Sequence, residues 1–432
     1  MIPVDAQSAV EGLLYAVDGE GNSYFAGNLL DDATGHVDIG GPVRCPIMTP
    51  QASSAFVVKI DSSGARAWQR CVARWTDMPY GAGITAIAAA PSGDVVVAGV
   101  AVTEVRFGDV DVVPPDANGD TFLMRLDASG QTRFVTTWTP APSTVALAAN
   151  DVGDTVASFV PDLGSVDFGV PVEGSGATLL ARFDASGSAQ WAREYDMDAS
   201  HSPIALSPSG DVAITDGAGV ARIAATGAVL WGTRWSSPSA GPWSGSATWP
   251  ALAFDSASAV LLAGGTTFPS NFGGDRVESP FGFAYLLGVG ADGAFDWSQT
   301  VDDTSWGDDG DIGYLGFPLP TAGGIATSTD GRTLAAIGFP NGFRFEGQRP
   351  PCHGCGALVE VSADHASTTI ETVTTTKREV EDPRVALLGV AFGPHERVVL
   401  GSFDGTDLEI GGAAAPIEPG VARYFLAGLP DE

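Results

Sequence analysis

Five acidic residues crowd one short stretch of the chain, where their carboxylate oxygens could hold a Ca²⁺ ion. The calcium-binding loop D-x-[DN]-x-[DN]-G, with its later Glu, is absent from this stretch. Solvated loop acids are the competing interpretation, and the sequence leaves both open. No motif requires a cofactor, so Ca²⁺ is the metal ion that we consider. The cluster contains Asp302, Asp303, Asp308, Asp309 and Asp311, and the last four are the candidate metal ligands.

A second chemical candidate is the run CHGC, in which Cys352 and Cys355 enclose His353. This run could form a local disulfide, half of a metal site or a reactive thiol pair. We favour the disulfide, because a zinc site takes about four ligands and the run supplies at most three. Cys45 and Cys71 lie within one repeat and are the candidates for a second disulfide. An even, sparse count of four cysteines fits an oxidising compartment.

The histidines do not form a recognisable catalytic arrangement. The five of them are spread along the chain, and apart from His353 in CHGC none lies in a Ser or Cys motif. The sequence also lacks a nucleophile elbow, a P-loop and an HExxH motif. Nothing in it therefore supports catalysis, although distant loops could still assemble an enzyme site.

These candidate residues are carried by a hairpin that recurs along the chain. In each copy an apolar run ends at a small polar turn, and an aromatic residue follows four positions after the turn glycine. Such a unit is typical of two strands joined by a tight turn. Five copies of one hairpin indicate a repeat protein. The copies occupy residues 56–68, 122–134, 179–191, 220–231 and 286–297.

Each repeat divides into four short strands, and the first strand is rich in small apolar residues. Seven first strands, spaced by about 60 residues, are typical of a β-propeller with one four-stranded antiparallel blade per repeat. Small side chains suit the innermost strand, because the blades crowd around the axis. We therefore predict an all-β, seven-bladed propeller that occupies residues 1–432 as one domain. The approximate repeats are 12–74, 84–138, 144–196, 203–235, 249–301, 323–376 and 385–432.

Ring closure is expected to involve the two ends of the chain. The last repeat ends after its third strand, near Leu429. We predict that the amino-terminal segment, Ile2 to Ala6, supplies the missing outer strand, since closure removes exposed strand edges. An open seventh blade of three strands is the competing interpretation.

Six of the seven repeats carry an insert between the second and third strands, and the fourth repeat lacks it. The segments PSGDVVVAG (91–99), VDFG (166–169) and FVVKIDSSGARAW (56–68) resemble the repeat of the bacterial seven-bladed β-propeller family called SBBP. The resemblance covers nearly the whole chain, although the sixth repeat has no aromatic residue after Val361. It implies a propeller fold and, commonly, a secreted or cell-surface location, and it carries over no catalytic residue.

A basic residue recurs two positions before the turn aspartate. On a strand packed between blades, this residue is expected to form an ion pair or a hydrogen bond to the neighbouring blade. Convergence of these cations on a central channel would instead indicate an anion site. The residues are Lys59, Arg125 and Arg182, with Arg222 in the matching place.

The loops divide between two faces of the predicted disc. Turns from strand 1 to 2 and from strand 3 to 4 are short, whereas inserts and blade-to-blade crossings are long and aromatic. We predict that the binding site lies on the long-loop face, because binding residues usually lie on variable loops that a rigid scaffold holds in place. The aromatic residues of this face could stack on a sugar, bind a peptide or pack within their own loops. The missing insert of the fourth repeat should leave a notch in the rim beside them. The candidates are Trp75, Tyr80, Trp243, Trp306 and Tyr314.

The charge and hydropathy of the chain argue against some classes of binding partner and against a membrane-spanning segment. A net charge of −31 would repel nucleic acid and anionic lipid, so no nucleic-acid partner is expected. No apolar span has transmembrane length, and the first residues lack the features of a signal peptide. We expect a monomeric, extracellular or cell-surface binding module for a carbohydrate or protein partner. The alternative is a hydrolase or lyase that acts on a carbohydrate or another small substrate. A purely structural surface protein is the third hypothesis.

Overall fold

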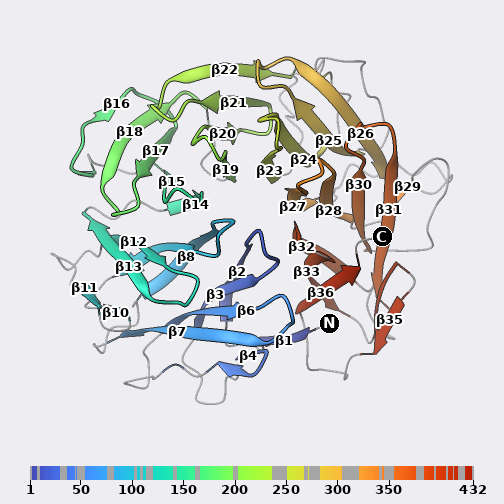
Figure 1. Cartoon of the computed structure of the whole chain (residues 1–432), viewed down its shortest axis with the longest axis horizontal. Coiled ribbons are helices and arrows are strands. Elements are labelled where there is room, and N and C mark those ends of the chain that lie inside the picture. Colours follow the sequence, from blue (N-terminus) through green and yellow to red (C-terminus); the bar gives the residue numbers. More distant parts are fainter. Residues whose placement is uncertain are drawn as a thin grey trace, which may run out of the picture.

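Seven sheets radiate from a common axis in the computed structural model, which Figure 1 shows end-on. The part of the chain that the structure describes contains strands and turns and no helix. The predicted all-β propeller with seven blades is therefore confirmed. The described residues are 2–6, 10–29, 37–43, 45, 54–74, 82–101, 105–107, 110–112, 120–139, 144–160, 166–197, 203–235, 251–266, 271, 283–303, 321–339, 343–344, 355–375, 384–393, 396–404, 407–411, 413–416 and 424–430.

The first strand of each blade lies nearest the axis (Figure 1). Small side chains such as Ala86, Ala88 and Ala148 are buried there, as the crowding of blades around an axis requires. Blades are numbered in chain order. Their first strands are β2 (Val10–Val17), β8 (Ala82–Ala89), β14 (Thr144–Ala149), β19 (Ile204–Leu206), β23 (Ala251–Phe254), β27 (Thr321–Thr327) and β32 (Arg384–Phe392).

The second and third strands form the middle of each blade. They are buried along most of their length because neighbouring blades cover both faces, which explains their continuous apolar runs. The second strands are β3 (Ser23–Leu29), β9 (Val95–Ala101), β15 (Thr155–Phe159), β20 (Val212–Thr215), β24 (Val260–Thr266), β28 (Thr333–Phe339) and β33 (Glu396–Asp404). The third strands are β6 (Ser54–Ile60), β12 (Asp120–Leu126), β17 (Thr178–Phe183), β21 (Gly219–Ile223), β25 (Phe283–Val289), β30 (Cys355–Val361) and β36 (Tyr424–Pro430).

Blades 1 to 6 each continue into a fourth, outer strand. Blade 4 is complete without an insert, and blade 6 is complete without an aromatic residue on its outer strand. The outer strands are β7 (Arg66–Arg74), β13 (Thr132–Trp138), β18 (Ala189–Tyr195), β22 (Val229–Arg234), β26 (Phe295–Asp303) and β31 (Thr368–Thr375).

The ring closes through the amino-terminal strand β1 (Ile2–Ala6). This strand pairs antiparallel with β36, and the register places Ile2 opposite Leu426 and Val4 opposite Tyr424. It is therefore the fourth strand of blade 7, as predicted, and the alternative of an open blade is excluded.

In the described part of the chain, four inserts pair with the blade that precedes their own repeat. For example, Val105 of the insert in repeat 2 lies opposite Arg74 of blade 1. Each of these inserts pairs with the free edge of an outer strand, whose backbone groups could otherwise pair with a strand of another chain. The strands are β4 (Val37–Ile39) and β5 (Pro42–Val43) on blade 7, β10 (Val105–Phe107) and β11 (Val110–Val112) on blade 1, β29 (Phe343–Arg344) on blade 5, and β34 (Asp407–Ile410) and β35 (Ala413–Pro416) on blade 6.

The insert of repeat 3 behaves differently. Its strand β16 (Val172–Glu173) pairs in parallel with β18 of its own blade, and Phe168 is buried against Trp138 of blade 2. Repeat 4 has no insert that could cover β18, so this strand takes that place. The gap expected from the missing insert is thus occupied, at least along β18, by another segment of the chain.

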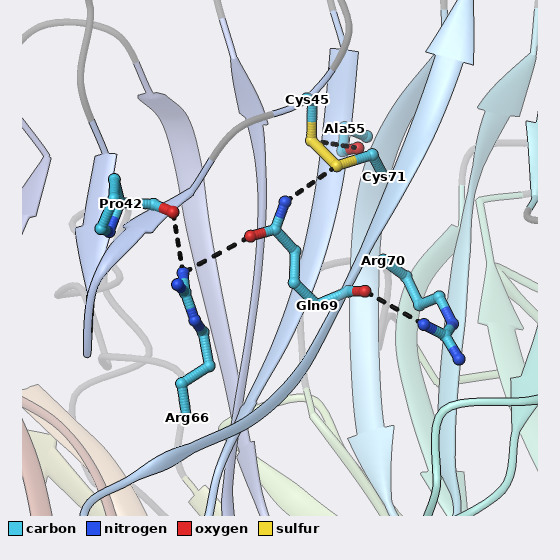
Figure 2. Close-up of a disulfide and its surroundings, with 7 residues drawn as sticks. All are labelled: Pro42, Cys45, Ala55, Arg66, Gln69, Arg70 and Cys71. Carbon is cyan, nitrogen blue, oxygen red and sulfur yellow. Dashed lines mark hydrogen bonds between the residues drawn. A yellow bond between two sulfur atoms is a disulfide. The ribbon is translucent and has the colours of Figure 1, made fainter.

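The predicted disulfide between Cys45 and Cys71 is present (Figure 2). It joins two blades, whereas the place of both cysteines in one repeat predicts a bond within one blade. Cys45 follows β5, which extends the sheet of blade 7, whereas Cys71 lies in β7 of blade 1. Arg66 strengthens the same connection, because its Nη1 donates to the Pro42 carbonyl at 2.9 Å. The bond therefore fastens the closing blade to the first blade.

The turns between the third and fourth strands follow one design. Asp127 Oδ1 accepts hydrogen bonds from the amides of Ser129 and Gln131, at 2.9 Å each, and Gly130 adopts a φ of 79°. Glycine is favoured at such a position because it has no Cβ to clash. The register shifts between Arg125 and Leu126, and the hairpins of blades 1, 3, 4 and 5 have a bulge at the same position beside the turn, whereas that of blade 6 has none. This geometry explains the recurring Asp-x-Ser-Gly sequence.

Candidate functional site

A cavity of about 830 Å³ opens at the axis, on the face of the short turns. All seven blades contribute to it through the turn between their first and second strands. This is the face opposite to the predicted long-loop face. Its lining includes Gly19, Pro91, Asn150, Asp151, Val152, Leu206, Pro208, Phe254, Asp255, Ser256, Thr327, Ser328, Asp330, Arg332, Phe392 and Gly393.

Contacts between neighbouring turns hold the rim of this axial cavity. The Ser92 amide donates to Asp151 Oδ1 at 2.6 Å, from blade 2 to blade 3. The Gly19 amide donates to the Pro91 carbonyl at 3.1 Å, from blade 1 to blade 2. Such bonds fix the rim as a rigid ring, which favours preorganised binding.

Three carboxylates face the axial cavity, on Asp151, Asp255 and Asp330. Asp255 is oriented by the Ala259 amide, which donates to its Oδ1 at 2.7 Å. Hydrogen bonding from the Ser328 hydroxyl is the main effect that lowers the pKa of Asp330, and the neighbouring Arg332 adds to it. Asp330 is therefore an ionised acceptor at neutral pH and not a proton donor.

Aromatic and aliphatic groups separate these carboxylates. Phe254 and Phe392 are half-buried, and Val152 is 69% exposed at the rim. The Arg332 guanidinium lies 5.2 Å from the centre of the Phe392 ring and also pairs with Asp330 and Glu360. The cavity thus combines apolar surfaces with hydrogen-bond acceptors.

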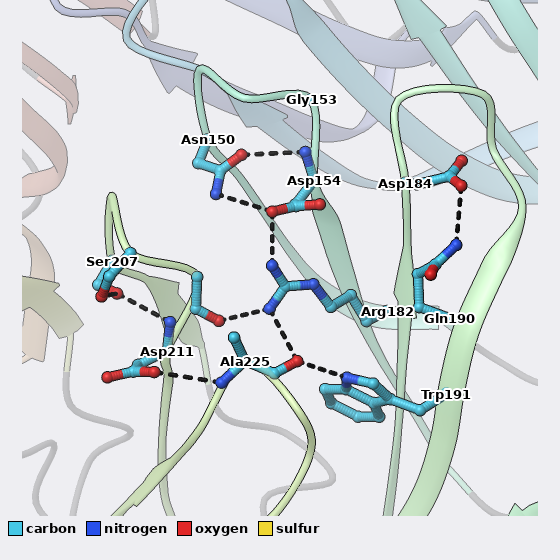
Figure 3. Close-up of polar contacts among 12 residues, drawn as sticks. Asn150, Gly153, Asp154, Arg182, Asp184, Gln190, Trp191, Ser207, Asp211 and Ala225 are labelled. Carbon is cyan, nitrogen blue, oxygen red and sulfur yellow. Dashed lines mark hydrogen bonds and ion pairs between the residues drawn. The ribbon is translucent and has the colours of Figure 1, made fainter.

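The recurring basic residues lie between the blades and not in the axial cavity. Figure 3 shows Arg182 of blade 3, whose Nη2 pairs with Asp154 of its own blade at 2.5 Å. Its Nη1 donates to the carbonyls of Gly210 and Ala225 in blade 4, at 2.6 Å and 3.1 Å. The predicted hydrogen bonds between blades are therefore observed, whereas the ion pair lies within one blade. We call this arrangement a junction socket.

The same socket recurs at three other blade junctions. Each cation pairs with an acid of its own blade and donates to a turn carbonyl of the next blade. The pairs are Lys59 with Asp18 and the Ala128 carbonyl, Arg125 with Asp94 and the Gly153 carbonyl, and Arg222 with Asp211 and the Ser258 carbonyl.

The junction between blades 6 and 7 reverses the charges. Glu360 occupies the socket, and it accepts from Arg332 of its own blade at 3.0 Å and from Arg397 of blade 7 at 3.2 Å. Sequence reasoning missed this pair because it searched for a cation at each position before the turn. The signal was present as Glu360 two residues before Ser362, in the place of the turn aspartate.

The candidate residues of the long-loop face lie outside the described residues. Asp303 is described only as the end of β26, where its backbone pairs with Phe343. Cys355 takes part in a disulfide, but its proposed partner Cys352 is outside the described part, so this pairing stays a prediction. Among the described residues, no group of three potential ligands could hold a metal ion, and no helix has the length and apolar character to cross a membrane. The candidates outside are Trp75, Tyr80, Trp243, Trp306, Tyr314, Asp308, Asp309 and Asp311.

Comparison with known proteins adds little beyond the fold. No protein-family model and no curated protein matches the chain. A streptogramin B lyase structure is 11% identical with a TM-score of 0.45, and the match covers 95% of this chain and 98% of that chain. The Neurospora crassa Pan2 WD40 domain is 6% identical with a TM-score of 0.45, covering 98% of this chain and 90% of that one. A gluconolactonase from Xanthomonas campestris is 14% identical with a TM-score of 0.29, covering 61% of this chain and 91% of that one.

Proposed function

We propose that the protein is a binding module that takes a carbohydrate in the axial cavity. One observation carries the proposal: a cavity of about 830 Å³ to which every blade contributes a turn. That volume lies within the range of about 300–1,000 Å³ that small-ligand sites occupy. The mouth of a propeller axis is also a concave site on a rigid scaffold, where ligands are commonly held.

The chemistry of the lining fits a sugar. Carboxylates such as Asp255 accept hydrogen bonds from hydroxyl groups, and rings such as Phe254 present apolar surfaces to the C–H face of a pyranose. Ser256 and Ser328 add hydroxyl groups that can donate or accept. A ligand with alternating polar and apolar faces matches this mixture better than a purely charged or purely apolar ligand.

Asp330 does not supply the proton donor that the hydrolase alternative would need. A glycosidase needs one carboxylic acid whose pKa is raised, so that it holds a proton at working pH. In Asp330 the pKa moves in the opposite direction, because the Ser328 hydroxyl and Arg332 stabilise its ionised form. This carboxylate is suited to accepting hydrogen bonds.

An extracellular or cell-surface location belongs to the same proposal. The bond between Cys45 and Cys71 would persist in an oxidising compartment, and the net charge of −31 suits a medium rich in counter-ions. Binding of a protein partner through Trp243 and Trp306 on the long-loop face remains the second candidate, in agreement with the SBBP-like repeat.

A glycan array followed by calorimetry tests the proposal. The strongest glycan should bind about five- to a hundredfold more weakly to Asp255→Asn and to Phe254→Ala, since each variant removes one contact of about 1–3 kcal/mol. Asp364→Asn is the matched control, because this carboxylate caps an outer turn of blade 6. Absence of any glycan binding, turnover of the bound glycan, or equal affinity of all three variants would contradict the proposal.

A further inference from the structure

The junction between blade 7 and blade 1, which we call the seam, lacks the cation that fills four other junction sockets. In β12 the run FLMRL places Arg125 opposite Val96 of β9. In β36 the run FLAGL places Gly428 opposite Val398 of β33. Gly428 is therefore the residue that corresponds to the socket cation.

The acidic half of the socket is nevertheless retained at the seam. The Ala90 amide donates to the Asp94 carbonyl to close the turn before β9, and the Gly393 amide donates to the Glu396 carbonyl in blade 7. Glu396 thus corresponds to Asp94, the acid that pairs with the socket cation of blade 2. A Cβ built on Gly428 would lie 2.1 Å from Glu396 Oε2, so the carboxylate occupies the position where that side chain would begin.

A cavity of about 270 Å³ lies at the seam, where the other sockets hold a guanidinium or ammonium group. This volume exceeds the roughly 30 Å³ of one water molecule several times. Its blade 1 wall contains Gly21 and Ser62, which correspond by turn position to Gly210 and Ala225. Those two residues supply the carbonyls that accept from Arg182. The remaining lining residues are Ser23, Asp61, Ser63, Gly64, Glu396, Val398, Leu426 and Gly428.

Two buried hydroxyl groups lie near each other at the seam cavity. Ser23, which lines the cavity, is 1% exposed, and neither its Oγ nor the Tyr15 hydroxyl makes a hydrogen bond of normal geometry to a described residue. Burial raises the pKa of Tyr15, and its interaction with the Ser23 hydroxyl lowers it. An unpaired buried hydroxyl is costly, so a ligand that donates a hydrogen bond to Ser23 would be favoured.

The closing strand does not fill this space in the described part of the chain. In blades 1 to 5 the outer strand brings an aromatic residue opposite the socket position, as Trp191 lies opposite Arg182. Strand β1 begins at Ile2, which lies opposite Leu426, two residues before Gly428. Gly428, which lines the seam cavity, is exposed, so the cavity can be reached from solvent beside this residue.

The other two junctions show that the chain fills the space when no cation is present. Between blades 5 and 6 the position is Gly288, where the indole of Trp297 lies 2.3 Å from a built Cβ. Trp297 then stacks on His365 of blade 6, with ring centres 4.6 Å apart. Between blades 6 and 7, Glu360 and Arg397 fill the socket. The seam differs from both, because it keeps an acid and an open cavity together.

We propose that the seam binds a guanidinium group supplied from outside the described chain. The group would pair with Glu396 and donate to the carbonyls of Gly21 and Ser62, as Arg182 does within blades 3 and 4. A guanidinium is preferred to an ammonium, because three of the four filled sockets hold arginine and the fork can reach several acceptors at once. An arginine side chain of a peptide and a small guanidine share this chemistry.

Calorimetry with the intact protein tests the proposal directly. Nα-acetyl-arginine methylamide should bind with one-to-one stoichiometry, and the citrulline analogue, which is neutral and nearly isosteric, should bind at least about tenfold more weakly. Glu396→Gln should weaken binding of the arginine probe by a similar factor. Comparison of agmatine with a Gly-Gly-Arg-Gly-Gly peptide distinguishes a small guanidine from a peptide arginine as the better occupant.

A variant that should gain stability while it loses probe binding gives a result that misfolding cannot explain. Gly428→Arg should abolish probe binding and raise the urea midpoint, because the chain then supplies its own cation and only the flexible end of Glu396 must move. Gly428→Leu is the matched control: it should block the probe without the salt-sensitive gain in stability. Asp255→Asn in the axial cavity should leave seam binding unchanged, which separates this inference from the proposed function. Equal binding of the arginine and citrulline probes, or unchanged binding by Gly428→Arg, would overturn the proposal.

Discussion

Arg125 and Asp94 form a buried ion pair in which Arg125 Nε lies 2.9 Å from Asp94 Oδ2. The Arg125 side chain is 2% exposed, and its Nη1 also reaches the Gly153 carbonyl of blade 3. One side chain therefore links the second and third strands of its own blade to the turn of the next. Because the charge is paired and its donors are used, burial is tolerated at this position.

We expect Arg125→Met to lower the free energy of unfolding by about 3 kcal/mol, because it leaves Asp94 buried without its main partner. The matched control is Arg133→Ala, which removes the other cation on Asp94. Arg133 is 53% exposed and should contribute less than about 1 kcal/mol. Urea midpoints measured by tryptophan fluorescence would check the difference, and equal losses in the two variants would contradict it.

Replacement of both Cys45 and Cys71 by serine should lower the free energy of unfolding by roughly 3–4 kcal/mol, since the bond closes a loop with a sequence separation of 26. Hydrogen exchange should then increase in β1 and β4 more than in blade 4, because this bond joins the closing blade to the first. Denaturant midpoints and exchange mass spectrometry would measure both effects. Uniform exchange around the ring would argue against a local role.

Acid should destabilise the protein through its turn aspartates. Hydrogen bonding from Ser186 is the main effect that lowers the pKa of Asp184, and Ser63 has the same effect on Asp61. A folded pKa below the unfolded value gives stability that is present above the unfolded value of 3.8 and is lost as the pH falls through the folded pKa. We therefore expect urea midpoints to be flat near neutral pH and to fall below about pH 4.

The same carboxylates permit a site-specific test. Ser186→Ala should raise the pKa of Asp184 towards its ordinary value, as measured by NMR titration of the carboxyl carbon. Ser63→Ala is the control, because it acts on Asp61 and leaves Asp184 unchanged. An unshifted Asp184 titration in Ser186→Ala would show that the hydroxyl is not the cause.

Gly130→Ala should be more destabilising than Gly169→Ala. Both glycines have similar positive φ values, 79° and 80°, so both variants incur about 1–2 kcal/mol of backbone strain. At Gly130 the new Cβ would lie 2.8 Å from Trp68 Cδ2, whereas nothing lies within 4 Å of a Cβ at Gly169. The added clash should cost a further 1–3 kcal/mol, approximately, in the urea-derived free energy of unfolding. Equal effects would mean that Trp68 moves freely.

The sequence predicted the fold because local patterns repeat in it. The spacing of glycine and aromatic residues around turns such as Asp127–Gly130 marks five hairpins, and the seven first strands give the number of blades. The positions of Arg125 and Arg182 before the turn were enough to predict contacts between blades. These features depend on neighbours along the chain, so one sequence is sufficient to find them.

Other features depend on which blades meet in space. Each turn contributes a few residues to the lining of the axial cavity, such as Pro91 and Asp255. No single turn has an unusual sequence that would mark the cavity. The pairing of β4 with β1 joins an insert to a strand from which it is separated by the hairpin of β2 and β3, and no local pattern specifies that choice. Glu360 and Arg397 were missed because their charges are exchanged relative to the other junctions.

The pairing of four inserts with the preceding blade means that the units of the sequence are offset from the units of the structure. A fragment cut at a repeat boundary would begin with a repeat whose insert has lost its partner, the outer strand of the preceding blade. The outer strand of its last blade would lack the insert that pairs with it in the whole chain. Gene duplication or excision of one repeat would therefore disturb two blades at once. A circular permutant would best be opened between blades 3 and 4, where β16 returns to its own sheet.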